Sequence, residues 1–412
     1  MTSQLHSEPT DVRRLGRRSV AAAMATTIMV VAPLHLLGAM AVLVREDLDF
    51  DPARLGVTFA MFNVGGIVAS IPGGRLAERL GPGRSMVTAG MLTAATALVI
   101  AFLAREWWQL TAAMAVAGMA NGLGQPAASL MLARGVPARR QGMAFGMKQA
   151  AVPLAGVLSG ISVPIVGLTI GWRWAFGCIA FGVIAIAATS PSTRAAHGAR
   201  RTVGAFRRAR SAENRSAPTS SPRIGTMLLV AFAFGSASAT TIPSFLAETA
   251  VDAGYSSSFA GLAVASGSTI GLISRLGVGV FADRSASGHL KAVSAMLAVG
   301  TLGSVGLAFG DTSNAVFLLG SAVAYGAGWG WPGLYLFAIV RLFPDRPGAA
   351  TGQAQAGGTV GALLGPLLFG WIATTTGFRT GWLAMAGIGS IAAALILLSH
   401  RRQHAGVVPE LG

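Results

Sequence analysis

One lysine lies well inside a long apolar stretch of this sequence. Lys148 stands in the apolar run 142–167, and Lys291 is the only other lysine among the 31 Lys and Arg residues. A lysine at the centre of a membrane-spanning helix costs about 2.5–3.5 kcal/mol, which is tolerated where its ammonium group meets water or an anion. Lys148 therefore marks a candidate site for an anionic solute. It also lies about six residues from the end of the run, so a second interpretation stays open, in which its flexible stem reaches back to lipid headgroups.

Other ionisable residues occur in or near the apolar runs. His35 is the only one of six histidines in the middle of a run, and imidazole titrates near physiological pH, so His35 is a candidate carrier of a coupling proton. The alternative is that His35 only forms a hydrogen bond to a neighbouring helix. Arg275 and Glu248 lie toward the ends of their runs, so we expect Arg275 to meet lipid or a gate acid and Glu248 to lie at the membrane interface. No Asp or Glu falls in the middle of a run.

Aromatic residues gather in one apolar run. Tyr325, Trp329, Trp331 and Tyr335 recur at roughly helical spacing, which predicts either a wall that contacts a solute or ordinary helix packing. The full set of predicted substrate-binding residues is His35, Asn63, Asn121, Gln125, Lys148, Gln149, Tyr325, Trp329, Trp331 and Gln355.

Long apolar helices are needed to position these side chains. The composition is 53% hydrophobic and only 11% charged, whereas soluble domains are about a quarter charged. Crossing a hydrocarbon layer of about 30 Å takes about 20 helical residues. We predict twelve such runs, at 19–44, 54–77, 85–104, 109–133, 142–167, 172–190, 225–248, 257–282, 289–310, 314–338, 347–372 and 379–399. The fold class expected is therefore an all-α membrane protein with twelve transmembrane helices.

The net charge of +16 is distributed unevenly over the predicted loops. If the twelve helices alternate from a cytoplasmic start, nearly all of the 31 Lys and Arg residues fall on the cytoplasmic side, and the five exceptions are Arg45, Arg54, Arg105, Arg173 and Arg379. This pattern follows the positive-inside rule and predicts a multi-pass protein of the cell (inner) membrane with both termini in the cytoplasm. Nucleic acid is not an expected partner, because it would need basic residues gathered on one soluble face.

Four short motifs of the first half recur in the second half. They are GRLAER (74–79) with GVFADR (279–284), GLGQP (122–126) with GWGWP (328–332), GMAFGMKQA (142–150) with GAATGQAQA (348–356), and GWR (171–173) with GFR (377–379). The acidic residues of the first pair are 205 positions apart, and the other three pairs are offset by 206. Internal duplication is typical of transporters whose halves rock about a central site. We therefore predict two pseudo-symmetric six-helix bundles.

The predicted bundles are separated by a stretch rich in Ser, Pro and Arg. The expected division is a cytoplasmic tail at 1–18, a first bundle at 19–190, a cytoplasmic linker at 191–224, a second bundle at 225–399 and a cytoplasmic tail at 400–412. The repeat pairs Gln149 with Gln355, so these two amides either hold one solute from both sides or bond neighbouring helices. Glycines spaced four residues apart predict close helix contacts. They are Gly118 and Gly122, Gly156 and Gly160, and Gly357, Gly361 and Gly365.

The text GGRLAERLGPGR at 73–84 resembles the loop signature of the major facilitator superfamily. The matching residues are Gly74, Leu76, Ala77, Arg79 and Gly81, whereas Glu78 replaces the usual aspartate and Pro82-Gly83 precedes Arg84. The resemblance extends over nearly the whole chain and implies alternating access around a cavity between the halves. It also implies a gating role for a set of loop residues, for which an ordinary charged turn is the alternative. The set is Gly74, Glu78, Arg79, Arg84, Asp283 and Arg284.

Transport is the function that these observations favour. We expect a secondary active transporter for a small anionic organic solute, with an efflux pump for amphipathic compounds or drugs as the alternative. The run at 146–160 lacks the G-x-x-x-G-P-x-x-G-G motif usual in drug–proton antiporters of the family. A sensor that keeps the fold without transport is a third possibility. No run carries a metal-ligand cluster or a nucleophile–base pair, so we expect no enzyme activity, no metal and no cofactor. The expected partners are the solute, membrane lipids and a coupling proton, and the expected state is a monomer.

Overall fold

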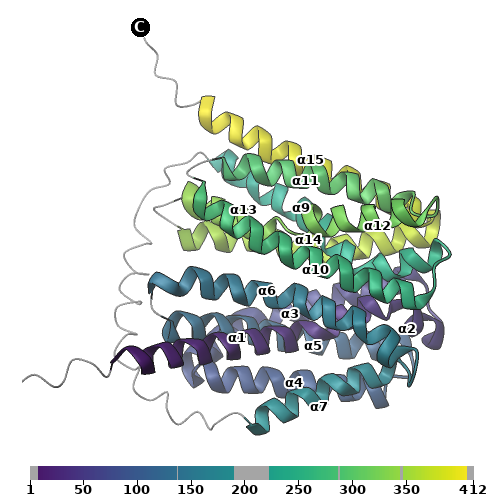
Figure 1. Cartoon of the computed structure of the whole chain (residues 1–412), viewed down its shortest axis with the longest axis horizontal. Coiled ribbons are helices and arrows are strands. Elements are labelled where there is room, and N and C mark those ends of the chain that lie inside the picture. Colours follow the sequence, from purple (N-terminus) through teal and green to yellow (C-terminus); the bar gives the residue numbers. More distant parts are fainter. Residues whose placement is uncertain (1–7, 137, 190–221, 286–287, 344–346, 406–412) are drawn as a thin grey trace, which may run out of the picture.

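The computed structural model describes residues 8–136, 138–189, 222–285, 288–343 and 347–405, and the regular structure in these ranges is entirely helical (Figure 1). The first half contains α1 (Glu8–Ala39), α2 (Ala41–Leu48), α3 (Pro52–Leu80), α4 (Pro82–Phe102), α5 (Trp107–Gly135), α6 (Ala138–Ser162), η1 (Val163–Gly167) and α7 (Trp172–Thr189). The second half contains α9 (Pro222–Asp252), α10 (Ser257–Arg284), α11 (His289–Ala308), α12 (Asn314–Val323), η3 (Ala324–Gly328), α13 (Pro332–Leu342), α14 (Pro347–Thr376) and α15 (Phe378–Ala405).

Each of the twelve predicted spans corresponds to one helix or to a run of consecutive helices. Nine of the described helices are long and apolar enough to cross a membrane by length and composition. The other three spans are α5, α7 and the segmented α12–η3–α13. The described part of α7 has 18 residues, and the tenth span is divided by the π-helical turn η3. The protein is thus an all-α, multi-pass membrane protein with twelve transmembrane helices, as the sequence predicts.

Several helices are longer than the apolar runs that predicted them. The first helix, α1, begins at Glu8, inside the predicted tail, and α15 continues to Ala405. The seventh span, α9, begins at Pro222, so its first turn lies within the predicted linker. A helix continues past the apolar layer where its backbone hydrogen bonds continue, and charged residues such as Arg17 are good helix formers there. The rest of the predicted linker, 191–221, lies outside the described residues.

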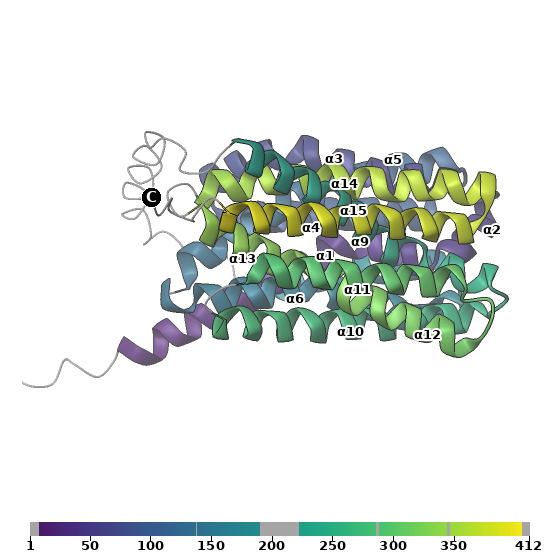
Figure 2. The ribbon, with the colours of Figure 1, turned by 90° about the horizontal axis from the view of Figure 1, so that it is seen from above.

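The two halves pack side by side as two layers of roughly parallel helices. Figure 1 shows α1–α7 in the lower layer and α9–α15 in the upper one, and Figure 2 shows the same bundle from above. The main contacts between the halves are made by α3 with α14 and by α6 with α10. We call the end that carries the described chain ends the linker end; it also holds Leu80, Gly135, Arg284 and Leu342. The opposite end is called the far end and holds Leu48, Phe102, Asp252, Ala308 and Thr376.

The predicted repeat is visible in equivalent hydrogen bonds at the far end. Arg173 in the GWR motif donates from Nη2 to the carbonyl oxygen of Ala104 at 2.8 Å. Its counterpart Arg379 donates from Nε to the carbonyl oxygen of Ala308 at 3.2 Å. Each arginine therefore binds the carbonyl end of the third membrane span of its own half, where a cation complements the helix dipole. The glycines two residues earlier both have positive φ, at 99° for Gly171 and 95° for Gly377, a conformation that glycine adopts without steric cost.

The glycine pairs predicted to make close helix contacts do so. A Cβ atom on Gly118 of α5 would lie 1.9 Å from the carbonyl oxygen of Phe62 on α3. In the second half, a Cβ atom on Gly361 of α14 would lie 2.0 Å from the carbonyl oxygen of Ala233 on α9. No side chain fits at such distances, so these helices approach backbone to backbone, as small residues permit in membranes.

Candidate functional site

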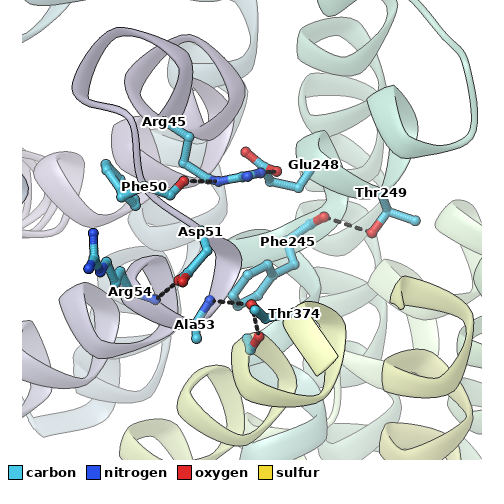
Figure 3. Close-up of polar contacts among 10 residues, drawn as sticks. Arg45, Phe50, Asp51, Ala53, Arg54, Phe245, Glu248, Thr249 and Thr374 are labelled. Atoms are coloured by element: carbon cyan, nitrogen blue, oxygen red, sulfur yellow. Dashed lines mark hydrogen bonds and ion pairs between the residues drawn. The ribbon is translucent and has the colours of Figure 1, made fainter. Parts of the chain in front are cut away.

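At the far end the two halves are joined by an ion pair. Arg45 on α2 pairs through Nη1 with Glu248 on α9, and its Nε donates to the carbonyl oxygen of Phe50 at 2.9 Å (Figure 3). The side chain of Glu248 is only 4% exposed. Nearby, the backbone N–H of Ala53 donates to Oγ1 of Thr374 at 2.8 Å, again across the halves (Figure 3). The sequence-based expectation that Glu248 lies at the membrane interface is therefore wrong, because α2 covers it.

The glycines of α6 and α10 continue this closure toward the middle of the bundle. A Cβ atom on Gly160 would lie 2.5 Å from the backbone nitrogen of Ala265, and one on Gly156 would lie 2.5 Å from Oγ of Ser268. The halves are also close where α3 meets α14, since a Cβ atom on Gly56 would lie 2.5 Å from the carbonyl oxygen of Pro366. The two halves are thus in backbone contact from the far end to the middle.

At the glycines near the linker end, the same four helices show no such contact. A Cβ atom would have no neighbour within 4 Å at five glycines near that end, namely Gly74 on α3, Gly146 on α6, Gly277 and Gly279 on α10, and Gly352 on α14. The inter-half hydrogen bond nearest to this region is donated by Nδ2 of Asn63 to the carbonyl oxygen of Ala362 at 3.2 Å. In this conformation the halves are closed at the far end and part toward the linker end.

The predicted solute-binding lysine lies in the first half, bonded to α5. Lys148 Nζ donates to Oγ of Ser129 at 2.9 Å and to the carbonyl oxygen of Gln125 at 3.3 Å. The Gln125 amide in turn donates to Oδ1 of Asn121 at 3.3 Å. Lys148 is only 6% exposed, so its ammonium group points to α5 rather than out to the membrane surface. None of the three ion pairs among the described residues includes it.

Three of the sequence candidates are thus brought together by α5 and α6. Ser129 completes the group, and sequence reasoning missed it because a serine one turn after Gln125 carries no signal of its own. We call these residues the Lys148 cluster; they are Asn121, Gln125, Ser129 and Lys148. Gln149 and its repeat partner Gln355 are exposed and do not belong to this group.

A second polar group surrounds Trp329 between the halves. The guanidinium carbon of Arg275 lies 4.3 Å from the centroid of the Trp329 ring, and its Nη2 donates to the Trp329 carbonyl oxygen at 3.1 Å. The His35 ring lies 6.1 Å from the same indole and the Tyr325 ring 5.4 Å, measured between centroids. His35 Nδ1 lies 3.0 Å from the Val31 carbonyl oxygen. Arg275 faces the interior of the protein here, so the expectation that it meets lipid is wrong.

The predicted aromatic face is divided into two environments. Tyr325 and Trp329 lie in the group just described, whereas Trp331 and Tyr335 are fully buried in the core of the second half. There Phe232 stacks on Tyr335 with centroids 4.5 Å apart and meets Trp331 edge to face at 5.3 Å. The hydroxyl group of Tyr335 donates to a backbone carbonyl at 2.7 Å. Trp331 therefore presents no surface to a solute in this conformation.

The predicted gating residues lie at the linker end. Glu78, Arg79, Arg84 and Arg284 are exposed there, and none of them takes part in the three ion pairs of the described residues. Gly74 has open space on its Cβ side. The side chain of the remaining member, Asp283, lies outside the described residues. The arrangement fits a loop that has no partner across the halves while the linker end is open.

The ion pair at the far end gives a first testable expectation. Glu248→Gln keeps the shape of the side chain but removes the charge opposite Arg45, and breaking a buried ion pair costs about 3–5 kcal/mol. We expect the far end to open in a larger share of molecules. Spin labels at Trp108→Cys and Asn314→Cys, at the far ends of the two halves, should report a longer distance in a Cys178→Ser background.

The Arg379–Asp311 pair provides the matched control. Both side chains are 53% exposed and both belong to the second half, and exposed pairs contribute at most about 1 kcal/mol. Asp311→Asn should therefore leave the label distance unchanged. Equal distances in Glu248→Gln and the unmodified protein would show that the Arg45 pair does not hold the far end closed.

Comparison with known proteins agrees with this architecture. The sequence matches the family model described as Major Facilitator Superfamily at residues 18–352 and 227–411. A protein of Agrobacterium vitis named for tartrate transport is 26% identical over 395 residues, covering 89% of this chain and 86% of the relative. A protein of Cupriavidus necator named for sulfoacetate transport is 24% identical over 390 residues, covering 86% of this chain and 87% of the relative.

Solved structures share the fold at low sequence identity. A bacterial homologue of the human lysosomal transporter Spinster, in an inward-facing and occupied conformation, superimposes with a TM-score of 0.73 at 15% identity and covers 96% of this chain and 98% of its own. A D-xylose–proton symporter gives a TM-score of 0.72 at 16% identity, covering 92% and 96%. Two like-folded bundles, a far end closed by contacts between them and a family match along nearly the full length lead to one conclusion: this chain belongs to the Major Facilitator Superfamily.

Proposed function

We propose that this protein is a secondary active transporter that moves a small anionic organic solute across the cytoplasmic membrane by alternating access. One observation carries the proposal: Lys148 is buried within the bundle, held by two hydrogen bonds to α5, and has no acidic partner among the described residues. A buried cation without a counter-ion is stabilised when an anion binds it. The relatives named for tartrate and sulfoacetate transport support the same class of solute.

The linker end is proposed to face the cytoplasm. Among the described residues, Arg79, Arg84, Arg134, Arg284 and Arg341 lie at that end, as the positive-inside rule requires of the cytoplasmic side, and both termini are then proposed to lie in the cytoplasm. The structure accordingly corresponds to an inward-facing state. In the opposite state we expect the predicted gating residues to latch the two halves together; they are Gly74, Glu78, Arg79, Arg84, Asp283 and Arg284.

Further candidate contacts complete the proposal. Asn121 and Gln125 are placed to bind the solute beside Lys148, whereas Gln149, Gln355 and Asn63 are proposed to contact it as the halves close. His35 lies between the halves and is the proposed carrier of a coupling proton, since imidazole exchanges protons near physiological pH. The protein is proposed to act as a monomer in lipid, without enzyme activity or a cofactor.

Efflux of amphipathic drugs has less support. It was suggested by the four aromatic residues of the tenth span, of which Trp331 and Tyr335 are enclosed in the core of the second half. The relatives reported above are also named for the transport of anions and not for the transport of drugs. We therefore do not favour this alternative.

A counterflow assay in proteoliposomes tests the proposed function. Vesicles loaded with an excess of unlabelled tartrate or sulfoacetate should accumulate the labelled anion when they contain the protein, and empty vesicles should not. Amphipathic cations such as ethidium should neither be accumulated nor compete. Absence of counterflow for every member of a panel of small carboxylates and sulfonates, with active transport of ethidium, would reverse the assignment.

A further inference from the structure

The polar group around Trp329 is built from both halves of the protein. We call it the Trp329 cluster; its members are His35 on α1, Ser268 and Arg275 on α10, Tyr325 in η3, and Trp329. His35 and Ser268 both border Gly156 of α6, because a Cβ atom there would lie 3.4 Å from His35 Cδ2 and 2.5 Å from Ser268 Oγ. Arg275 and Tyr325 both contact the Trp329 ring. The cluster therefore lies where α1, α6, α10 and the tenth span meet.

Its members contain buried polar atoms that have no hydrogen-bond partner. These atoms are Nε2 of His35, Oγ of Ser268, Nε of Arg275 and the hydroxyl oxygen of Tyr325. The Ser268 and Tyr325 hydroxyl groups lie close enough to interact with each other, whereas His35 Nε2 and Arg275 Nε are left with no partner. Buried polar groups are nearly always satisfied in native proteins, so several unpartnered atoms in one place indicate a missing ligand. Three of the four side chains donate hydrogen bonds readily, which suits an acceptor-rich anion.

Arg275 is the charge in this cluster. None of the three ion pairs among the described residues includes it, and the stacking on Trp329 compensates only part of the cost of its partial burial. An arginine presents a planar fork of donors that matches a carboxylate or a sulfonate. The guanidinium donors of Arg275 that have no partner are therefore suited to bind one acidic group of a solute.

The antiparallel register of α6 and α10 places Arg275 level with Lys148. Gly160 of α6 faces Ala265 of α10, and one turn further Gly156 faces Ser268. Two more turns toward the linker end, about 12 Å along each axis, lead to Lys148 on α6 and to the position next to Arg275 on α10. The two halves thus carry one unpaired cation each at the same depth, on opposite sides of the region that opens to the linker end.

We propose that the Trp329 cluster is the second half of the solute site, and that the solute is a small dianion bound between Lys148 and Arg275. This rests on the proposed function and specifies it further. One acidic group of the solute binds the Lys148 cluster and the other binds Arg275, with Ser268 and Tyr325 as additional donors. A dianion neutralises both charges only when it contacts both halves, so its binding draws them together at the linker end. A monoanion satisfies one half and leaves the other charge unpaired.

Tartrate and threonate form a matched pair of probes for this inference. Threonate has the carbon skeleton and hydroxyl groups of tartrate with one carboxylate replaced by a hydroxymethyl group. Affinities are measured on the purified full-length protein in lipid nanodiscs by competition with a labelled dianion. The unmodified protein should bind tartrate about ten- to a hundredfold more tightly than threonate, the range expected for one charge-assisted contact. Arg275→Gln should lower tartrate affinity to the threonate level and change threonate affinity little.

The remaining variants distinguish a failure of the dianion site from a failure of the proposed function. Arg275→Lys, which keeps the charge, should retain part of the preference for tartrate, and it serves as the test if Arg275→Gln does not fold. Lys148→Met should weaken both probes, because the first acidic group loses its cation. Equal affinities for tartrate and threonate in the unmodified protein, or an equal loss of both in Arg275→Gln, would overturn the dianion site while leaving anion transport intact. Failure of Lys148→Met to affect either probe would instead count against the proposed function.

Discussion

Lys148→Met is expected to lower the uptake efficiency of the transported anion by about a hundredfold or more. Methionine has nearly the same length and fills the same space, but it removes the ammonium group that Ser129 and the Gln125 carbonyl hold in place. A hydrogen-bonded charge pair in a buried site contributes about 3 kcal/mol, which corresponds to about a hundredfold in affinity. Initial rates of anion uptake into proteoliposomes, over a range of concentrations, measure the effect.

Two further variants decide whether the charge itself is responsible. Lys148→Arg keeps the charge but changes the donor geometry, so we expect intermediate uptake. Lys291→Met removes the only other lysine, which is exposed near the linker end, and should transport normally. If Lys148 served only to join α5 and α6, Lys148→Met would lower thermal stability without altering anion affinity in the folded fraction. That result would remove the main support for an anion site.

Gly160→Leu is expected to lower transport strongly by holding the far end apart. The Cβ position of Gly160 lies 2.5 Å from the backbone nitrogen of Ala265 and 2.6 Å from the carbonyl oxygen of Gly261. Both are backbone atoms of α10, so they cannot move aside as a flexible side chain does. Because these contacts cross between the halves, each half keeps its own packing while the seam opens. We expect uptake to fall about tenfold or more, since overpacking by a large side chain costs about 1–3 kcal/mol.

The spin-label pair at Trp108→Cys and Asn314→Cys provides a second measurement. In Gly160→Leu the distance between these far-end labels should increase, as it does when the far end opens. Gly387→Leu is the control, because Gly387 is exposed on α15 and its Cβ position has no neighbour within 4 Å. Normal transport and an unchanged distance in Gly160→Leu would mean that the contact between α6 and α10 is not needed for closure.

The fold was predictable because its main determinant is local in the sequence. A run of about 20 apolar residues specifies a membrane-spanning helix almost regardless of its neighbours. The glycines at four-residue spacing likewise predicted close contacts, which the backbone distances at Gly118 and Gly361 confirm. Neither inference required knowledge of which helices meet. The exact helix ends were less predictable, since α1 and α15 continue as helices beyond the apolar residues.

The site was predictable only in part, because it depends on pairs of residues that are distant in the sequence. Lys148 was identifiable as an unusual charge, but its direction depends on Ser129 of the preceding helix. The sequence position of Arg275 predicts contact with lipid, whereas its packing on Trp329, 54 positions away, shows that it faces inward. The sequence position of Glu248 predicts a residue at the interface, whereas α2 folds over it in the structure. Sequence position gives depth in the membrane, whereas it does not give the direction of a side chain around the helix axis.

The π-helical turn η3 bears on how far the two duplicated halves have diverged. A π-helical turn holds more residues than an α-helical one, so it rotates the residues that follow it around the helix axis. In the second half η3 interrupts the tenth span, whereas its repeat counterpart in the first half is the continuous α-helix α5. The two walls of the site are therefore not identical copies. A site between two unlike walls distinguishes the two ends of a solute, so we expect an asymmetric or chiral solute to bind in a single orientation.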